Sequence, residues 1–330
     1  MKIAVYAIAK DEAKNVRDWY NSMCEADEIY VLDTGSTDGT PDILRALGCK
    51  VAVQVCEPFR FNVARNVSMG MVAPDVEWLV CTDLDERFSA GWRDVLEKTI
   101  RKRGGYGLNS VMCKFITSFK EDGTPLNCMD YWKIHKARSA HWEGACHEFL
   151  VWDEPRITTY INESKMWLEH HPDAEKKRDY YLPMLERACK EERTARNLFY
   201  YGRELMFHGR YAAALAVLME YIGRPDATWT SERAWGMRFA ARCLWQLKEG
   251  NLAVHWYVRA AAEAPDQRES LVEYARFCAE CEQYGEAVKA LEIALSRKAR
   301  PKVFFTEDDC WDDTPQKLLE EYRQKAKGGN

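Results

Sequence analysis

Residues 78–85 read WLVCTDLD, a short apolar run followed closely by two aspartates, Asp83 and Asp85. The apolar run predicts a buried strand, and side chains of a strand alternate between the two faces of its sheet. Two carboxylates two residues apart then leave the strand on the same side and can face one cation. Carboxylate oxygens suit Mg²⁺ or Mn²⁺, which usually complete their shell with water and nucleotide phosphates. The stretch therefore predicts a site for a metal-bound diphosphate.

The surrounding residues predict a mostly parallel sheet with helices on its faces. Strands are predicted at residues 3–7, 28–33, 51–55 and 78–83, and helices at residues 12–24, 41–47 and 62–71. Further along, a helix is predicted at residues 90–101 and strands at residues 111–119 and 131–137. Short apolar runs that alternate with amphipathic segments are typical of nucleotide-binding α/β domains.

The second half of the chain has a different texture, with long helical periodicity and many alanines from about residue 173. One pattern occurs three times at spacings of 39 and 34 residues: Ala214, Leu218 and Tyr221; Ala253, Tyr257 and Ala260; Ala287, Leu291 and Ala294. This period resembles tetratricopeptide repeats, which stack as helical hairpins, and an irregular helical bundle is the alternative. We predict an α/β domain at residues 1–172 and a helical repeat domain at residues 173–330.

Size and composition indicate a soluble globular protein. The chain has 330 residues, enough for about two domains, and 47% of them are apolar and 30% charged. The net charge of −5 argues against a mainly electrostatic nucleic-acid binder. No apolar run is long enough to predict a membrane span, and residues 1–10 are interpreted as part of a strand and not as a signal peptide. The 12 scattered cysteines are interpreted as reduced thiols, so we expect a cytoplasmic protein.

A second polar segment, residues 33–40, also follows a predicted strand, about 50 residues before the aspartate pair. Its two glycines permit a tight turn, and its oxygens can bind a sugar or a base edge. Both segments then lie at the carboxyl ends of parallel strands, where ligands of open α/β sheets gather.

Four segments in this order resemble the signatures of family 2 glycosyltransferases with the GT-A fold: Lys10-Asp11-Glu12-Ala13-Lys14-Asn15, residues 33–40, Phe61-Asn62-Val63-Ala64-Arg65-Asn66 and Asp83-Leu84-Asp85. The resemblance covers roughly residues 1 to 170. Together with the repeats it is similar to bacterial and phage enzymes with a tetratricopeptide tail, such as peptide S-glycosyltransferases and lipopolysaccharide-core transferases. Such relatives imply inverting transfer from a nucleotide sugar, usually a UDP-sugar.

On this resemblance, the donor would be bound by Ala7, Glu12, Asp33, Arg65, Asp83 and Asp85. Asp33 would receive the uracil or ribose, Asp83 would lie near the ribose and the metal, and Asp85 would ligate Mn²⁺ or Mg²⁺. Arg65 would pair with a phosphate or orient an aspartate. A histidine after the sheet would be the remaining protein ligand; we favour His171, with His170 as the alternative.

The acceptor side is predicted at Trp142-Glu143-Gly144-Ala145-Cys146-His147-Glu148, which is similar to a Trp-x-Gly-x-x-His-Glu segment of such enzymes. An inverting displacement needs a group that removes the proton of the nucleophile. Glu148 is the predicted base, and His147 is its rival because its ordinary pKa lies near neutrality. A purely structural role of both residues in closing the loop is the alternative.

Several functional alternatives stay open at this stage. The enzyme alternative is a sugar nucleotidyltransferase, although no glycine-rich phosphate loop follows the first strand. The other alternative is a repeat-based binding scaffold with an inactive first domain. A peptide or protein, a glycan core and a modified nucleobase of phage DNA are all compatible acceptors, the last placing the protein in a host cytoplasm. The repeat domain is expected to bind the acceptor or a second copy of the chain.

Overall fold

The computed structural model describes residues 1–103, 107–120, 122–162, 164–173, 180–301 and 306–328. The chain forms two compact units, Met1–Lys177 and Arg178–Asn330. All twelve cysteines lie in the described residues as free thiols. None of the described helices combines the length and the low polarity that a membrane crossing requires.

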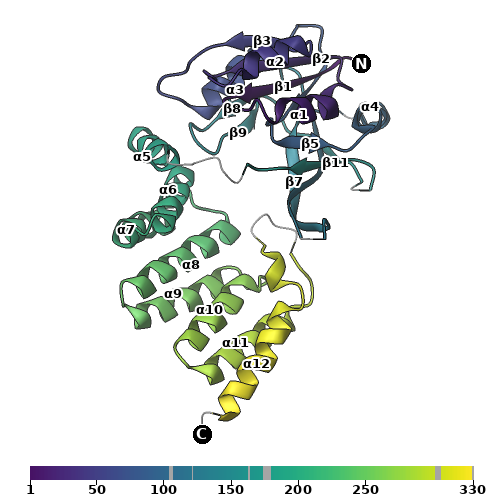
Figure 1. The fold of residues 1–330 in the computed structure, drawn as a ribbon. Helices are drawn as coiled ribbons and strands as arrows, with labels where there is room; N and C mark the ends of the chain where they lie inside the picture. Colours follow the sequence, from purple (N-terminus) through teal and green to yellow (C-terminus); the bar gives the residue numbers. More distant parts are fainter. Residues whose placement is uncertain (104–106, 121, 163, 174–179, 302–305, 329–330) are drawn as a thin grey trace. The chain divides into compact units, whose positions relative to one another are not determined.

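The first unit is built on a mixed sheet with the strand order β3-β2-β1-β4-β7-β6-β11-β5, and β10 pairs with β6 (Figure 1). These strands are β1 (Ile3–Ala9), β2 (Glu28–Asp33), β3 (Lys50–Val53), β4 (Trp78–Cys81), β5 (Glu86–Phe88), β6 (Ser110–Phe119), β7 (Pro125–Lys136), β10 (Thr158–Tyr160) and β11 (Trp167–His170). A separate hairpin holds β8 (Ala140–Glu143) and β9 (Phe149–Trp152). The connecting helices are α1 (Val16–Met23), α2 (Thr40–Ala46), α3 (Phe61–Gly70) and α4 (Trp92–Arg103). The predicted α/β domain is confirmed.

Each face of the sheet has its own hydrophobic core, as the alternating side chains of β1 and β4 require. On one face, Val5 and Val80 pack in a cluster that includes Trp19 of α1 and Trp92 of α4. On the other face, Tyr6, Leu79 and Cys81 pack with Trp142 of β8 and with part of α3. The second face is the one that carries the candidate site, because α3 and the β8–β9 hairpin bring their polar residues to it.

The first unit departs from the sequence prediction at the end of β4. This strand ends at Cys81, whereas the apolar run and its aspartate predicted strand as far as residue 83. The backbone N–H of Glu86 donates to the carbonyl oxygen of Asp83 at 3.0 Å, so the chain turns at this point. Asp83 and Asp85 lie outside the strand, so strand alternation does not determine where their side chains point. The two side chains have different partners.

The second unit consists of helices packed in sequence (Figure 1). They are α5 (Tyr181–Glu191), α6 (Ala195–Phe207), α7 (Tyr211–Ile222), α8 (Thr230–Gln246), α9 (Gly250–Glu263), α10 (Glu269–Glu280), α11 (Tyr284–Ser296), the short η2 (Asp308–Cys310) and α12 (Thr314–Gly328). Helices α6, α8 and α10 each form a hairpin with the next helix. The second helices of these hairpins begin at Tyr211, Gly250 and Tyr284, at spacings of 39 and 34 residues. The tetratricopeptide-like repeats are confirmed.

Glycines allow the repeat helices to approach closely. A Cβ atom added at Gly236 of α8 would lie 2.7 Å from Cε1 of Tyr221, and one at Gly202 of α6 would lie 2.8 Å from the side chain of Leu218. The ring of Tyr221 is fully buried and its hydroxyl donates to Glu232 at 3.0 Å. The ring therefore has little room to move away.

We predict that Gly236→Ala destabilises the repeat unit. Alanine favours a helix by about 1 kcal/mol over glycine, but forcing a group into a filled core costs about 1–3 kcal/mol. Gly285→Ala in α11 is the matched control, because a Cβ there meets no atom within 4 Å. Thermal unfolding followed by circular dichroism should show a lower Tm for Gly236→Ala and an equal or higher Tm for Gly285→Ala. Equal behaviour of the two variants would contradict the packing argument.

Candidate active site

The candidate site lies at the carboxyl edge of the parallel half of the sheet. Strand β1 pairs in parallel with β2 and β4, with Ala9 opposite Asp33 and Tyr6 opposite Cys81. The segments that follow these three strands therefore leave the sheet at one edge, where ligands of open α/β sheets bind. Those segments carry Glu12, residues 33–40 and residues 83–85.

Arg65 of α3 joins the predicted donor side to the predicted acceptor side. Its side chain is only 2% exposed. One Nη2 hydrogen bond goes to Asp83 Oδ1, and Nε donates to Glu148 Oε1 at 3.1 Å. The guanidinium also lies over the ring of Trp142, with 5.7 Å between Cζ and the ring centroid. The structure thus brings three of the predicted site residues together around one buried charge.

Asp83 has a second cationic partner, Lys133 of β7. The Nζ atom of Lys133 lies 3.2 Å from Asp83 Oδ2 and 3.6 Å from Glu86 Oε1. Burial alone would raise the pKa of Asp83, but the charges of Arg65 and Lys133 outweigh it and hold that pKa well below its usual range. Burial raises the pKa of Glu86, although the charge of Lys133 acts against the rise. Asp83 is therefore held as a carboxylate, and its charge is already balanced by protein cations.

Asp85 has a different environment from Asp83. Its Oδ2 atom lies 3.2 Å from Nε2 of His170, and its carbonyl oxygen accepts the backbone N–H of His171 at 2.7 Å. The hydrogen bond to Asp85 raises the pKa of His170. The imidazole of His171 lies elsewhere, with Nε2 3.1 Å from Glu169 Oε2 and its ring stacked on Phe119. The histidine that meets Asp85 is therefore His170, the alternative at the sequence level, and not the favoured His171.

Asp33 is fully buried and organises its own loop. Its Oδ1 atom accepts the backbone N–H groups of Gly35 at 3.0 Å and Ser36 at 2.8 Å, and its Oδ2 atom accepts the hydroxyl of Ser36 at 2.6 Å. The exposed residues of this loop follow directly, at positions 37–39. The carboxylate thus fixes the shape of the loop.

Glu12 belongs to a second loop that is hydrogen-bonded to the first. Its backbone N–H donates to the hydroxyl of Thr40 at 2.8 Å, and its carboxylate accepts the amide of Asn15 at 2.7 Å. Asp38 accepts the backbone N–H of Ala13 at 2.9 Å. The two loops that were predicted to bind the donor therefore form one connected surface.

The acceptor-side segment forms a strained turn before β9. Gly144 and His147 both have positive φ angles, 87° and 54°. A positive φ is uncommon for a residue with a side chain, and residues held in such conformations cluster at turns and active sites. The turn is anchored to α3, because the backbone N–H of Phe61 donates to the carbonyl oxygen of Ala145 at 2.9 Å. This anchoring places Glu148 beside Arg65, with 13% of the side chain exposed.

Buried side chains joined by hydrogen bonds lie in the core next to the site. The indole N–H of Trp142 donates to the hydroxyl of Tyr6 at 2.8 Å, and that hydroxyl lies 3.0 Å from Nε2 of His135. The predicted donor residue Ala7 lies next to Tyr6 in β1, fully buried, and its carbonyl oxygen accepts the hydroxyl of Ser68 at 2.7 Å. Ala7 thus fixes α3, and with it Arg65, against the sheet.

Sequence reasoning missed Lys133, Glu86 and Arg87. The carbonyl oxygens of Leu84 and Asn15 accept hydrogen bonds from the guanidinium of Arg87, at 2.6 Å and 3.2 Å, so this residue joins the turn at residues 83–85 to the loop that carries Glu12. Glu86 and Arg87 follow the aspartate pair directly, and two further charged residues next to such a pair were a usable signal. Lys133 lies within a predicted strand, where nothing in the sequence indicates its partners.

Comparison with known proteins supports the resemblance. Residues 5–165 match the sequence model of the family described as Glycosyl transferase family 2. A curated relative from Rickettsia bellii (strain RML369-C), described as an uncharacterized glycosyltransferase, is 28% identical over 125 residues, which cover 38% of this chain and 41% of the relative. The match thus spans about two fifths of the length of that relative.

Two solved structures are similar to part of the chain. One is the Yersinia enterocolitica type III secretion chaperone SycD in complex with a peptide of the translocator YopD, with a TM-score of 0.33, 16% identity and coverage of 41% of this chain and 96% of that chain. The other is the complex of the TPR2B domain of yeast Sti1 with pHsp70, with a TM-score of 0.33, 18% identity and coverage of 40% and 97%.

The buried imidazole of His135 predicts a loss of stability in acid. Burial lowers the pKa of His135 from 6.5 to about 4. Between these values the unfolded chain binds a proton that the folded chain does not, so stability falls as the pH drops from 6.5 to about 4, by roughly 3 kcal/mol. Urea unfolding at several pH values should show this loss. It should shrink in His135→Gln and persist in His255→Gln, which changes an exposed histidine; an unchanged loss in His135→Gln would contradict the assignment.

Proposed function

We propose that the chain transfers a glycosyl group from a nucleoside diphosphate sugar to an acceptor, using a divalent cation; the premise is the match of residues 5–165, in the N-terminal unit, to the Glycosyl transferase family 2 model. The observation that carries the proposal is the arrangement around Arg65. Its guanidinium contacts Asp83, from the predicted donor side, and Glu148, from the predicted acceptor side. A transferase needs these two functions next to each other, whereas a nucleotidyltransferase has no use for a carboxylate in the position of Glu148.

The residues present fit a cation at Asp85. Asp83 is balanced by Arg65 and Lys133, whereas the described partner of the Asp85 carboxylate is the imidazole of His170, itself a possible ligand. Oxygen and imidazole ligands together suit Mn²⁺ or Mg²⁺, with water and diphosphate oxygens completing the shell. When bound, such an ion neutralises the charge of the departing diphosphate. We propose His170 as the histidine ligand, in place of His171.

The donor is proposed to be a UDP-sugar. The connected loops that carry Glu12 and Asp33 offer a surface for the nucleoside at the carboxyl edge of the sheet. Asp33 holds the backbone of its loop in place, and residues 37–39 of this loop are exposed at the edge of the sheet, where the ribose or base would meet them. This assignment keeps Asp33 in the nucleoside site but gives it a positioning role.

The chemical step needs a protein group that accepts a proton from the acceptor nucleophile. We propose that Glu148 takes the proton of the acceptor nucleophile while the nucleophile bonds to the anomeric carbon and the bond from that carbon to the diphosphate breaks, which inverts the configuration. Arg65 binds Oε1 of Glu148 and thereby orients the carboxylate. His147 is the weaker candidate for the base, because its left-handed backbone serves the turn that positions Glu148.

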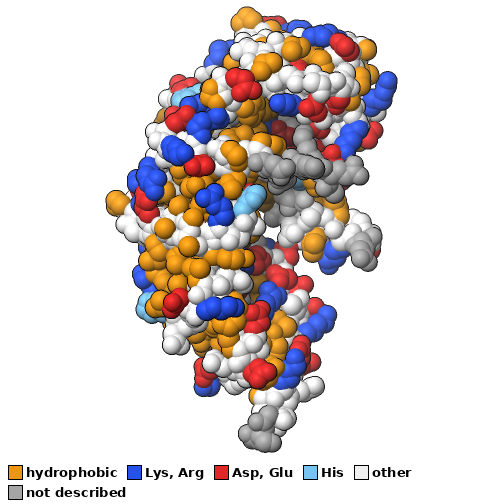
Figure 2. All heavy atoms as spheres, turned by 60° about the vertical axis from the view of Figure 1, so that its left-hand side comes forward, with side chains coloured by type: hydrophobic (Ala, Val, Ile, Leu, Met, Phe, Trp, Pro, Cys, Tyr) orange, Lys and Arg blue, Asp and Glu red, His pale blue; other side chains and the backbone are white. Residues whose placement is uncertain are grey.

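The repeat unit is proposed to bind a macromolecular partner, either the acceptor or a second copy of the chain, in the cytoplasm. Large hydrophobic side chains are exposed on several repeat helices, among them Phe207, Leu252, Val258 and Ile293. Figure 2 shows hydrophobic side chains gathered on one face of this unit. Such exposed patches usually mark interaction surfaces.

We predict that Asp85→Asn abolishes cation-dependent nucleotide binding. UDP with Mn²⁺ should raise the Tm of the unmodified chain, because a ligand that binds only the folded state stabilises it. The variant should lose the part of this shift that depends on Mn²⁺, because the amide keeps the shape of the side chain but not its charge. Asp94→Asn, an exposed aspartate of α4, is the control and should keep the shift. An equal shift in Asp85→Asn would refute the metal assignment, and GDP and CMP test the choice of nucleotide.

We predict that Glu148→Gln lowers turnover without weakening donor binding. The amide oxygen still accepts the hydrogen bond of Arg65, but it cannot take a proton, and loss of a general base reduces rates by about 10²–10⁴-fold. Release of UDP from a UDP-sugar, with water or an added acceptor, measures the rate. If His147→Gln shows the larger loss and Glu148→Gln retains activity, the roles are reversed. The UDP-induced Tm shift shows that both variants still bind nucleotide.

A further inference from the structure

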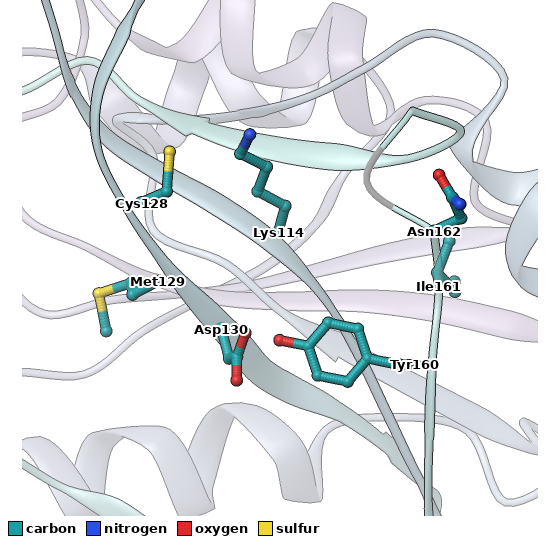
Figure 3. A pocket seen from close by; sticks show the side chains of 7 residues that line it. All are labelled: Lys114, Cys128, Met129, Asp130, Tyr160, Ile161 and Asn162. Atoms are coloured by element: carbon teal, nitrogen blue, oxygen red, sulfur yellow. The ribbon is translucent and has the colours of Figure 1, made fainter. Parts of the chain in front are cut away.

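The first unit has a surface pocket of about 540 Å³, lined by residues other than those described above. It is formed by strands β6, β7 and β10 and by the residues that follow β10 (Figure 3). Its polar lining consists of Lys114, Asp130, Tyr160 and Asn162. In Figure 3 the hydroxyl of Tyr160 points toward the carboxylate of Asp130. A volume of this size is typical of small-molecule sites, about 300–1,000 Å³.

The strand registers place this pocket at the same edge of the sheet as the candidate active site. Strand β7 runs antiparallel to β4, with Ile134 opposite Val80. Residues of β7 that precede Ile134 therefore extend beyond the end of β4, and Lys133 accordingly reaches Asp83. Asp130 lies three residues further in this direction, about 10 Å along the strand.

The pocket also lies on the same face of the sheet as Glu148. Cys113 and Tyr131 pack in the core on the side of α1 and α4. Lys114 and Asp130 are their neighbours in sequence and are paired with each other across β6 and β7, so they point to the opposite face. That face carries Trp142 and the hairpin that begins with it. The pocket is thus placed where a molecule that extends from Glu148 along the sheet would lie.

The lining favours a polyhydroxylated ligand without charge. A carboxylate accepts hydrogen bonds, an ammonium donates them, and an amide and a phenol do both. Sugar hydroxyls satisfy all four because each of them donates and accepts. Tyr160 is 51% exposed, so the face of its ring is accessible as a stacking surface.

Other ligand classes fit the lining less well. A nucleic-acid backbone requires an excess of cationic side chains, whereas the lining holds one cationic side chain, Lys114, and one carboxylate, Asp130. Extended peptides often add to a free sheet edge; β6 is paired on both sides, and of the strands that form the pocket β10 is the one paired on a single side.

We propose that this pocket binds a neutral saccharide and is the acceptor site of the transfer reaction. The role as acceptor site rests on the proposed function, whereas saccharide binding itself does not. A glycan is thereby favoured over a peptide and a nucleobase as the group that is glycosylated.

Saccharide binding can be tested with the full chain by saturation-transfer NMR. The probes are the methyl α- and β-glycosides of glucose, galactose, mannose and N-acetylglucosamine. At least one of them should receive saturation, and Tyr160→Ala and Asp130→Asn should each weaken its binding at least tenfold. Thr158→Ala is the matched control, because Thr158 is exposed on the same strand but does not line the pocket. No saturation of any probe, or equal binding by Tyr160→Ala, Asp130→Asn and Thr158→Ala, would overturn the proposal.

A second measurement separates this proposal from the proposed function. Every variant is also tested for the Tm shift caused by UDP and Mn²⁺, which requires Asp85 and not the pocket. The pocket variants should keep this shift, and Asp85→Asn should lose the shift but keep the saccharide signal. If the unmodified chain binds a glycoside but shows no shift with any nucleotide, transfer is refuted and saccharide binding stands. If the shift is present and no glycoside binds, the saccharide proposal fails alone.

Discussion

The buried guanidinium of Arg65 is the interaction on which the rest of the site depends. A charge that is 2% exposed is tolerated only when its donors are paired, and here they bind Asp83, Glu148 and the Cys81 thiol. These partners come from two parts of the chain: Cys81 and Asp83 belong to the end of β4 and the turn after it, and Glu148 belongs to the turn before β9. Helix α3, β4 and the β8–β9 hairpin must therefore fold together, and the two carboxylates cannot move independently.

The two aspartates next to this guanidinium have different charged partners. Arg65 and Lys133 neutralise Asp83, while Asp85 faces an imidazole. Glu86 and Glu148 add two further carboxyl groups to the same cations. Arg87 adds a third cation, whose charge acts on Asp85 and Glu86.

Much of this architecture follows from the sequence because it depends on local patterns. The strands and helices as far as β7, apart from the short β5, and the repeat spacings were predicted, whereas strands β8 to β11 were not. Arg65, Asp83 and Glu148 were among the predicted site residues. The choice of His170 over His171 was not predicted, because it depends on how β11 pairs with β5: His170 lies opposite Glu86, and the residue after it turns away. The role of Lys133 depends on a partner 50 residues away. Such contacts are set by strand register, which no local pattern reveals.

An irregularity in β7 connects the two halves of the site. Between Val111 and Cys113, β6 advances by two residues while β7 advances by three, from Ile134 to Tyr131. Tyr131 and Ile134 consequently pack in the same core, and the pair between them is directed elsewhere: Trp132 packs against Trp142, and Lys133 reaches Asp83. A bulge re-aims side chains in this way without interrupting the sheet. In a regular strand, Tyr131 and Ile134 would point to opposite faces. The irregularity lets β7 place Tyr131 and Ile134 in the core and Lys133 beside Asp83, while Asp130 lines the pocket.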